Sequence, residues 1–382
     1  MKWFGRKAAA SESRPVLSRA WMNGLAVALG EWPQTYEAQL RAAVIGNPVA
    51  QRAMRLVSDA VGGAVLRAEA DVPEDAARAL ALVNCRSAGQ GLMETLAAHV
   101  MLHGNGFVHI AGDGEGEPVR LYALRPERVA MEPDALGWPV AYSYRVGERV
   151  ARYPAEDGRG RTEVVHMRAF HPLDDHYGLG CLSAAAGAVA IHNSATCWNK
   201  ALLDNAARPS GAIVYEGTDG AGLSGEQFDR LKEELEATFQ GATNAGRPML
   251  LEGGLKWQAL SLSPADMDFV SLKAAAARDI ALAFGVPPML LGLPGDNSYA
   301  NYREANKALW RQTILPLADM ILCALAQGLR DRMPGLKLSV DLNIVPALVD
   351  DRTALWDRVA GADFLSNEEK RAMLGIAPAE EE

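Results

Sequence analysis

The side chains best suited to acid–base or metal chemistry in this chain are its seven histidines. His99 and His103 are four residues apart in a segment with a helical pattern, a spacing at which two histidines can bind a metal ion. Val, Met and Leu separate them, and no acidic residue or cysteine stands at the accompanying positions. His166, His171 and His176 fall in expected strand and loop, and their spacing matches no metal motif. The histidines therefore predict no metal site.

Paired carboxylates and glycine-rich loops are the other patterns that could carry chemistry. Asp174 and Asp175 are adjacent in an expected loop, whereas the acidic residues of GDGEGE (112–117) would repel a phosphate, so we expect a hairpin turn there. HGNG (103–106) lacks the ending of a nucleotide-binding loop, and GLSGE (222–226) fails the last position of a nucleophile elbow. No catalytic, cofactor-binding or metal-binding residue is predicted, and the chain is not expected to be an enzyme.

Composition excludes several further classes. The formal net charge of −9 argues against tight nonspecific DNA binding through a basic surface. The apolar run 314–326 is short and contains Asp319, so no membrane span is expected. The cysteines are scattered and are expected to be reduced thiols of a cytoplasmic protein: Cys85, Cys181, Cys197 and Cys323.

The elements that would position any site begin with a mixed block over residues 34–178, after an expected N-terminal arm at 1–33. Asn47 and Pro48 have the residue types of an N-cap and a first helical position, and Gly62-Gly63 ends that helix. A second helix is predicted from Gln90 to His103. Short alternating strands follow up to about residue 168, which predicts an α+β class.

Two long helical segments then flank a small αβ unit. The first begins near Cys181, and the second begins with Ser263 as N-cap and Pro264 and stops at Gly285. Helices of this length are rods of roughly 30–35 Å. Such a pair is also typical of an ordinary antiparallel packing in a core. Between them a strand, a helix with a Ser224–Gln227 capping box, and a hairpin over Gly253-Gly254 are expected.

The C-terminal third contains a long helical pattern interrupted by proline. Pro316 lies inside the pattern and should kink the helix, because it removes a backbone hydrogen bond and crowds the preceding turn. A strand near 337–345 and two short helices follow, the second with Ser366 and Glu369 as a capping box.

This order of elements resembles the portal proteins of long-tailed, siphophage-type bacteriophages and of gene transfer agents. The resemblance extends from about Asn47 to Pro378, and its most specific motifs are AFGVPPMLLG (283–292), the kinked helix, and FLSNEEKRAMLGIAP (364–378). It implies a portal fold with a wing, paired stem helices, an αβ clip, a long kinked helix and a small helical crown. The expected bounds are arm 1–33, wing 34–178, stem helices 179–208 and 263–285, clip 209–262, tunnel loop 286–301, kinked helix 302–332, returning strand 333–348, and crown with acidic tail 349–382.

The resemblance also implies a function. A dodecameric ring would form a channel at one capsid vertex of a virion or phage-like particle, assembled in the bacterial cytoplasm, through which double-stranded DNA is packaged and ejected. Its other partners would be the major capsid protein, the large terminase that supplies the energy, and later a head-tail adaptor. An acidic or neutral channel wall would let DNA slide without strong phosphate contacts.

Candidate functional residues follow from this resemblance. Neutral polar contacts to DNA are expected from the tunnel loop, at Asn297, Ser298, Tyr299 and Asn301. Lys273 and Arg278 of the second stem helix would touch phosphate or, in preference, form ion pairs with acidic residues of the same or a neighbouring copy. Clip residues expected to dock partners are Arg230, Glu233 and Glu234.

Two other functions stay open at this point. A hydrolase using the wing histidines would be a monomer or small oligomer with a pocket, and mutation of His99 and His103 should abolish its activity. A nonviral scaffold would bind partner proteins through its helices and would not associate with packaged DNA.

Overall fold

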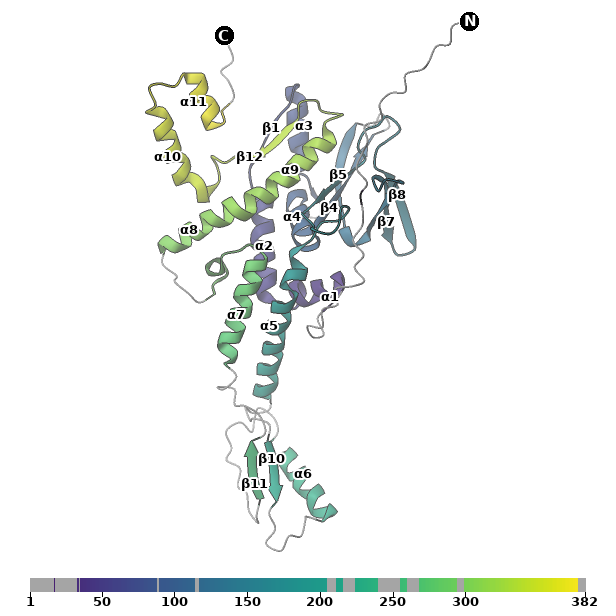
Figure 1. Ribbon diagram of the computed structural model, residues 1–382, viewed down its shortest axis with the longest axis vertical. Coiled ribbons are helices and arrows are strands. Elements are labelled where there is room, and N and C mark those ends of the chain that lie inside the picture. The colour runs from purple at the N-terminus through teal and green to yellow at the C-terminus, as the bar shows by residue number, and fades with distance from the viewer. Residues whose placement is uncertain are drawn as a thin grey trace.

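The computed structural model describes residues 17, 33, 35–87, 89–113, 117–204, 211–215, 224–239, 255–259, 268–293 and 299–376. Figure 1 shows an upper body of helices and strands, two long helices that extend from it, and a small αβ unit at the far end. The predicted α+β class is confirmed.

In the part of the chain that the structure describes, the helices include three short 3-10 turns and two π turns. Their bounds are α1 Tyr36–Leu40, η1 Arg41–Ile45 (π), α2 Pro48–Gly62, α3 Pro73–Val83, α4 Leu92–His103, η2 Pro126–Arg128 (3-10), α5 Cys181–Asp204, α6 Gly225–Phe239, α7 Phe269–Ala283, η4 Pro288–Leu291 (3-10), α8 Tyr299–Leu309, η5 Trp310–Ile314 (π), α9 Leu315–Leu329, η6 Pro346–Leu348 (3-10), α10 Val349–Ala360 and α11 Asn367–Leu374.

All strand pairs among the described residues are antiparallel, in sheets ordered β5-β4-β9, β6-β7-β8, β1-β12, β10-β11 and β2-β3. The strands are β1 Leu66–Glu69, β2 Arg86–Ser87, β3 Gln90–Gly91, β4 Asn105–Gly112, β5 Pro118–Leu124, β6 Val129–Pro133, β7 Pro139–Val146, β8 Arg149–Pro154, β9 Val164–Arg168, β10 Gly211–Tyr215, β11 Leu255–Ala259 and β12 Lys337–Val340.

Local signals placed several helix ends correctly. The Asn47 side chain accepts from the backbone amides of the first turn of α2, Pro48 is the first helical residue, and Gly63 follows the end. Gly104 ends α4 in the left-handed conformation, with φ of 83°. These predictions are confirmed.

The segment between α2 and α4 was not predicted in detail. β1 and α3 lie there, and β12 pairs with β1 in a sheet of two strands. The strand predicted after the long helix is present as β12, and its partner β1 lies within the block 34–178, in a sheet separate from those of β4 and β7. The short run Leu66–Glu69 carries too little alternation to show as a strand before its distant partner is known.

The main hydrophobic core joins α2, α4, β4, β9 and α9. Within the described chain, one helix, Tyr299–Leu329, is long and apolar enough to cross a membrane by length and composition alone. Its most apolar part is packed inside the body, where Ile321, Leu322, Leu325 and Leu329 are fully buried. The high hydropathy of this helix is therefore explained by its packing in the core of the body.

The predicted interruption of the long helix lies just before the proline. η5 widens the helix over Trp310–Ile314, and Pro316 then lies in the first turn of α9. Proline has no amide for the carbonyl four residues earlier, and a π turn accommodates such a break. The helix also begins earlier than expected, at Tyr299 instead of residue 302.

The start of the second long helix also differs from its prediction. α7 begins at Phe269, and Asp268 is its N-cap in the left-handed conformation, with φ of 43°. The prediction of a helix that runs from Pro264 through residue 268 is therefore wrong. Ser263 and Pro264 lie outside the described residues.

Candidate functional site

The two long helices α5 and α7 pack side by side between the upper body and the small αβ unit (Figure 1). Both helices carry buried alanines, namely Ala185 on α5 and Ala276 and Ala277 on α7, and such small side chains let packed backbones approach closely. Near the far end Trp198 stacks on Phe269, with ring centroids 4.2 Å apart. The pair is therefore a packed rod, called here the α5–α7 rod.

A buried asparagine joins this rod to the body. Asn47, only 1% exposed, donates its side-chain amide to Asn193 Oδ1 at 2.9 Å and lies 3.1 Å from His192 Nδ1. Asn193 in turn donates to the carbonyl of Ala42 at 2.9 Å. The N-cap of α2 thereby also fixes the position of α5 along the body.

The electrostatics at this junction keep His192 neutral. Burial lowers the pKa of His192, and the positive charge of Lys273 on α7 lowers it further. A neutral ring can accept the Asn47 amide proton at Nδ1. Of the two basic residues expected to act on this rod, Lys273 is partly exposed and Arg278 is exposed.

A glycine connects the upper end of α7 to the long helix. Gly285 has φ of 64°, and its carbonyl accepts from Thr313 Oγ1 at 2.7 Å. A Cβ at this position would lie 2.9 Å from the same hydroxyl oxygen. η5 is thus held directly against the end of α7.

The loop expected over 286–301 is shorter than predicted, because both ends of this segment belong to other parts of the fold. Val286 is buried, Pro288–Leu291 forms the 3-10 turn η4 against the body, and Tyr299 and Asn301 belong to α8. Tyr299 is 82% exposed in the first turn of that helix. Asn297 and Ser298 lie outside the described residues.

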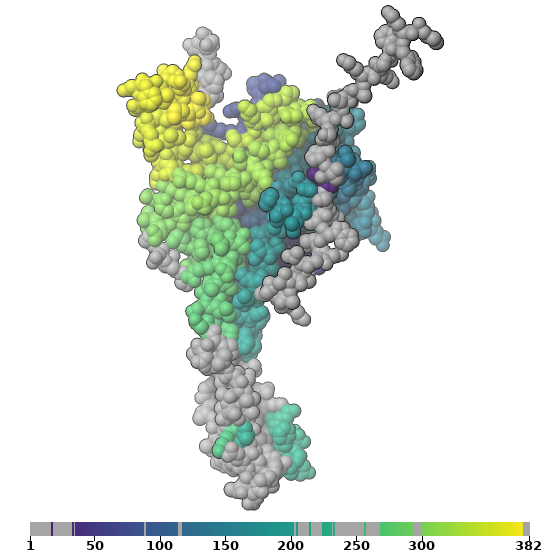
Figure 2. Space-filling model, viewed as in Figure 1, coloured from purple at the N-terminus to yellow at the C-terminus, as the bar shows by residue number. Residues whose placement is uncertain are grey.

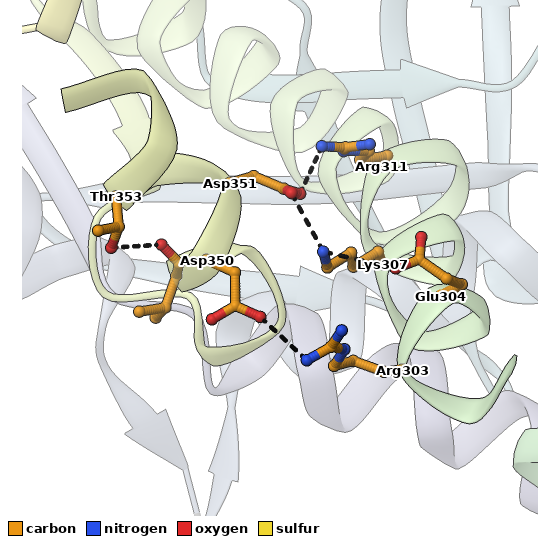
Figure 3. A network of polar contacts seen from close by, with 8 residues as sticks. Arg303, Glu304, Lys307, Arg311, Asp350, Asp351 and Thr353 are labelled. Carbon is orange, nitrogen blue, oxygen red and sulfur yellow. Dashed lines mark hydrogen bonds and ion pairs between the residues drawn. The ribbon is translucent and has the colours of Figure 1, made fainter. Parts of the chain in front are cut away.

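A basic face of α8 and η5 meets the C-terminal helices. Arg303, Lys307 and Arg311 recur every four residues and point toward the first turn of α10 (Figure 3). Lys307 Nζ lies 3.1 Å from Asp351 Oδ1, and Arg311 Nη2 lies 2.5 Å from Asp351 Oδ2. Arg303 pairs with Asp350 at 3.5 Å. The bond from Lys307 to Asp351 raises the pKa of Lys307.

The ion pairs between this basic face and α10 were not predicted from the sequence. The spacing of the three cations was readable, but their acidic partners lie about 40 positions later, in a helix whose packing the sequence does not reveal. The capping box expected in the next helix is present, since Ser366 and Glu369 exchange hydrogen bonds.

The small αβ unit lies at the opposite end of the molecule from α10 and α11 (Figure 1). β10 pairs with β11, and the predicted Ser224–Gln227 capping box starts α6. Arg230 and Glu233 are exposed on this helix, and Glu234 belongs to it. Phe228 of the same helix is 58% exposed. The hairpin strand expected at 248–253 lies outside the described residues.

The histidines of the body are built into its packing. His166 Nε2 donates to Asn105 Oδ1 at 3.1 Å, and its ring stacks on Phe107 at 4.2 Å. Asn105 also lies 3.0 Å from His103 Nδ1. Burial lowers the pKa of His166 to about 3 and that of His99 to about 4. The rings of His99 and His166 are therefore neutral at pH 7.

A cavity of about 870 Å³ lies beside these residues, lined among others by Tyr36, His103, Glu127 and Asp174. Asp174 Oδ1 accepts the backbone amides of His176 and Tyr177 at 2.7 and 3.0 Å, so this carboxylate shapes the local turn. Within the described part of the chain, no three His, Cys, Asp or Glu side chains are close enough to share a metal ion.

Comparison with known proteins gives a consistent result. A family model described as "Phage portal protein" matches residues 48–375. A protein of Rickettsia felis is 40% identical over 296 residues, which cover 77% of this chain and 76% of the relative.

Two solved structures are similar over most of the chain. A chain from the neck of a native gene transfer agent particle, computed with C12 symmetry, is 47% identical, with a TM-score of 0.68 over 91% of this chain and 95% of its own. An HK97-family portal protein from Corynebacterium diphtheriae has a TM-score of 0.59 at 19% identity, over 83% of this chain and all of its own, which is a likeness of fold.

Proposed function

This chain belongs to the phage portal protein family, and from that premise we propose that its copies form a dodecameric ring at one vertex of a phage-like particle. The observation that carries the proposal is the match over 91% of the chain to a neck protein with C12 symmetry. Heterologous contacts between identical copies close into such rings. Double-stranded DNA would enter during packaging and leave during ejection through the central channel.

The elements of the fold suit defined parts of that ring. We assign the upper body to a wing that meets the major capsid protein, the α5–α7 rod to the stem around the channel, and α10–α11 to a crown. The αβ unit would be the clip, which docks the large terminase first and a head-tail adaptor later. Arg230, Glu233 and Glu234 of α6 belong to this docking surface.

The channel-facing residues belong to the same proposal. Asn297 and Ser298, with Tyr299 and Asn301 of the first turn of α8, would project toward DNA and offer neutral polar contacts. Lys273 and Arg278 of α7 would pair with acidic residues of a neighbouring copy in preference to phosphate. Weak contacts repeated around the ring would resist backsliding and still permit passage.

This role requires no catalytic group in the chain itself. Energy for packaging would come from the terminase, because the sequence contains no nucleotide-binding motif. The hydrolase alternative, which rests on His99 and His103, finds no support in His99, because its Nδ1 is buried with no hydrogen-bond partner among the described residues that could orient or activate the ring.

Electron microscopy with no imposed symmetry tests the proposal on the purified protein and on particles that contain it. We expect rings with a central hole, located at the tail-bearing vertex. Particles that carry the chain on every face, or that lack it at the vertex, would rule out the portal role. If the protein is instead a nonviral scaffold, it should copurify with no packaged DNA.

A further inference from the structure

The C-terminal helix pair, defined here as α10 with α11, stands out as a lobe beside α8 (Figure 2). Of the described residues, none beyond Val340 belongs to the main apolar core or packs against it. The buried apolar residues of this segment, which belong to neither hydrophobic cluster, are Val345, Leu348, Val359 and Leu374. The lobe is therefore an addition to the body with little apolar attachment.

Polar contacts connect the lobe to the body instead. Arg67 donates from Nη1 to the carbonyl of Gly375, directly after α11, at 3.4 Å, and its Nε pairs at 2.8 Å with Asp341, which follows β12. On the other side, the basic face of Arg303, Lys307 and Arg311 meets Asp350 and Asp351, and α8 also touches η6. Arg303 and Asp350 are both largely exposed, so water and ions reach this interface. An accessible ion pair such as Arg303–Asp350 contributes little and exchanges readily with other ions, whereas the side chain of Lys307 is only 11% exposed beside Asp351.

The basic face has the form of a phosphate-binding surface. Three cations at intervals of four residues are spaced roughly 6 Å apart along one side of a helix. Arginine forks and lysine ammonium groups bind carboxylate and phosphate oxygens by the same charge-assisted hydrogen bonds. Glu304 of the same helix also lies 3.6 Å from Lys307, and Asp350 and Asp351 supply the remaining counter-charge in the folded chain.

We propose that this basic face of α8 and η5 binds the phosphate backbone of double-stranded DNA, and that Asp350 and Asp351 occupy it in place of phosphates until DNA displaces the C-terminal helix pair. The inference rests on the proposed function for the presence of DNA beside the ring. While Asp350 and Asp351 cover the basic face, DNA is free to slide past it. Once they are displaced, the basic face binds the phosphate backbone of the DNA.

The decisive variant neutralises the two carboxylates without changing their shape. We expect the purified Asp350→Asn/Asp351→Asn protein to bind a fluorescent duplex of about 30 base pairs on the order of tenfold more tightly than wild type at low salt, measured by anisotropy. The slope of log Kd against log salt should steepen by about 2.7, as expected for three phosphates. Adding Arg303→Gln, Lys307→Gln and Arg311→Gln should return both values to those of wild type.

A matched control separates this effect from net charge. Asp357→Asn with Asp363→Asn removes the same charge from exposed positions of the same segment, and should leave the affinity at the wild-type value. Equal affinities for the two double variants would overturn the proposal. Tight binding that persists after the three cations are removed would overturn it too.

A measurement on the wild type guards against a variant that does not fold. Hydrogen exchange of the intact protein at saturating duplex should show faster exchange in α10 and slower exchange around Arg303–Arg311. Unchanged exchange in α10 would refute the displacement. Ring symmetry by microscopy remains a separate readout, so rings without this DNA binding would reject only this inference, and DNA binding without rings would reject only the portal role.

Discussion

Asn47 couples two elements that are far apart in the chain, because one side chain caps α2 and bonds to His192 and Asn193 of α5. We expect Asn47→Ala to lower the free energy of unfolding by about 3 kcal/mol, through the lost cap and the unpaired buried groups. Urea unfolding measures this value.

An exposed cap provides the control for Asn47. Ser366→Ala removes only the capping interaction of α11 and should cost about 1 kcal/mol at most. Equal losses for the two variants would mean that the bonds of Asn47 to α5 contribute nothing.

The lowered pKa of His166 predicts that the stability of the protein depends on pH. This pKa is about 3 in the folded protein against an ordinary 6.5, so the unfolded chain takes up the proton first as the pH falls. The contribution of the neutral ring is complete above pH 6.5 and declines as the pH falls toward 3. At pH 5 the loss should be about 2 kcal/mol.

Unfolding in urea at pH 7 and pH 5 checks this expectation. His166→Gln should weaken the fall in stability between the two values, because the variant has no proton to gain at this position. An identical fall in wild type and variant would show that other groups cause it.

At the scale of elements, the contact between α7 and the long helix depends on Gly285. Gly285→Ala forces a positive φ on alanine and brings its Cβ to 2.9 Å from Thr313 Oγ1, so we expect a loss of about 2–4 kcal/mol. Gly375→Ala is the matched control: its φ is 69°, but open space surrounds the added Cβ. It should cost about 1–2 kcal/mol from the backbone alone. Chemical unfolding of both variants tests whether the Thr313 contact adds to that strain.

Which elements could be predicted from sequence depended on the range of the interactions that define them. Caps and breakers such as Pro48, Gly104 and the Ser366–Glu369 box act within a few residues, and these predictions are confirmed. β1 needs a partner about 270 positions later, so no local pattern could reveal it. Asp268 misled the prediction because a left-handed conformation at an aspartate follows from its surroundings and not from its residue type.

The same limit applies to the candidate site. Lys273 and Arg278 were found by residue type on a long helix, and Tyr299 and Asn301 by position, although both belong to α8 rather than to a loop. The Asn47–His192 junction and the ion pairs of α8 with α10 each join residues distant in sequence. Their geometry emerges only when the core has placed the helices.

For the whole molecule, the core clusters predict that the body folds without the αβ unit. No described residue between Asp204 and Asp268 belongs to either cluster. Replacing residues 205–267 by a Gly/Ser linker of about ten residues should therefore change the Tm of the body by less than about 5 °C. Differential scanning calorimetry measures the change, and a shorter excision within α4 is the destabilised control. Loss of the main transition in the linker variant would contradict this division.

The position of the αβ unit between α5 and α7 has a consequence for how the protein can evolve. Both helices lead into the unit at the same end of the rod, so to the rest of the chain it is a long insertion in a turn, and the entropy of closing such an insertion rises slowly with its length. Substitutions there escape the packing constraints that act on the core. Lineages that acquire new docking partners could therefore exchange or rewrite this unit while the remainder of the protein diverges slowly.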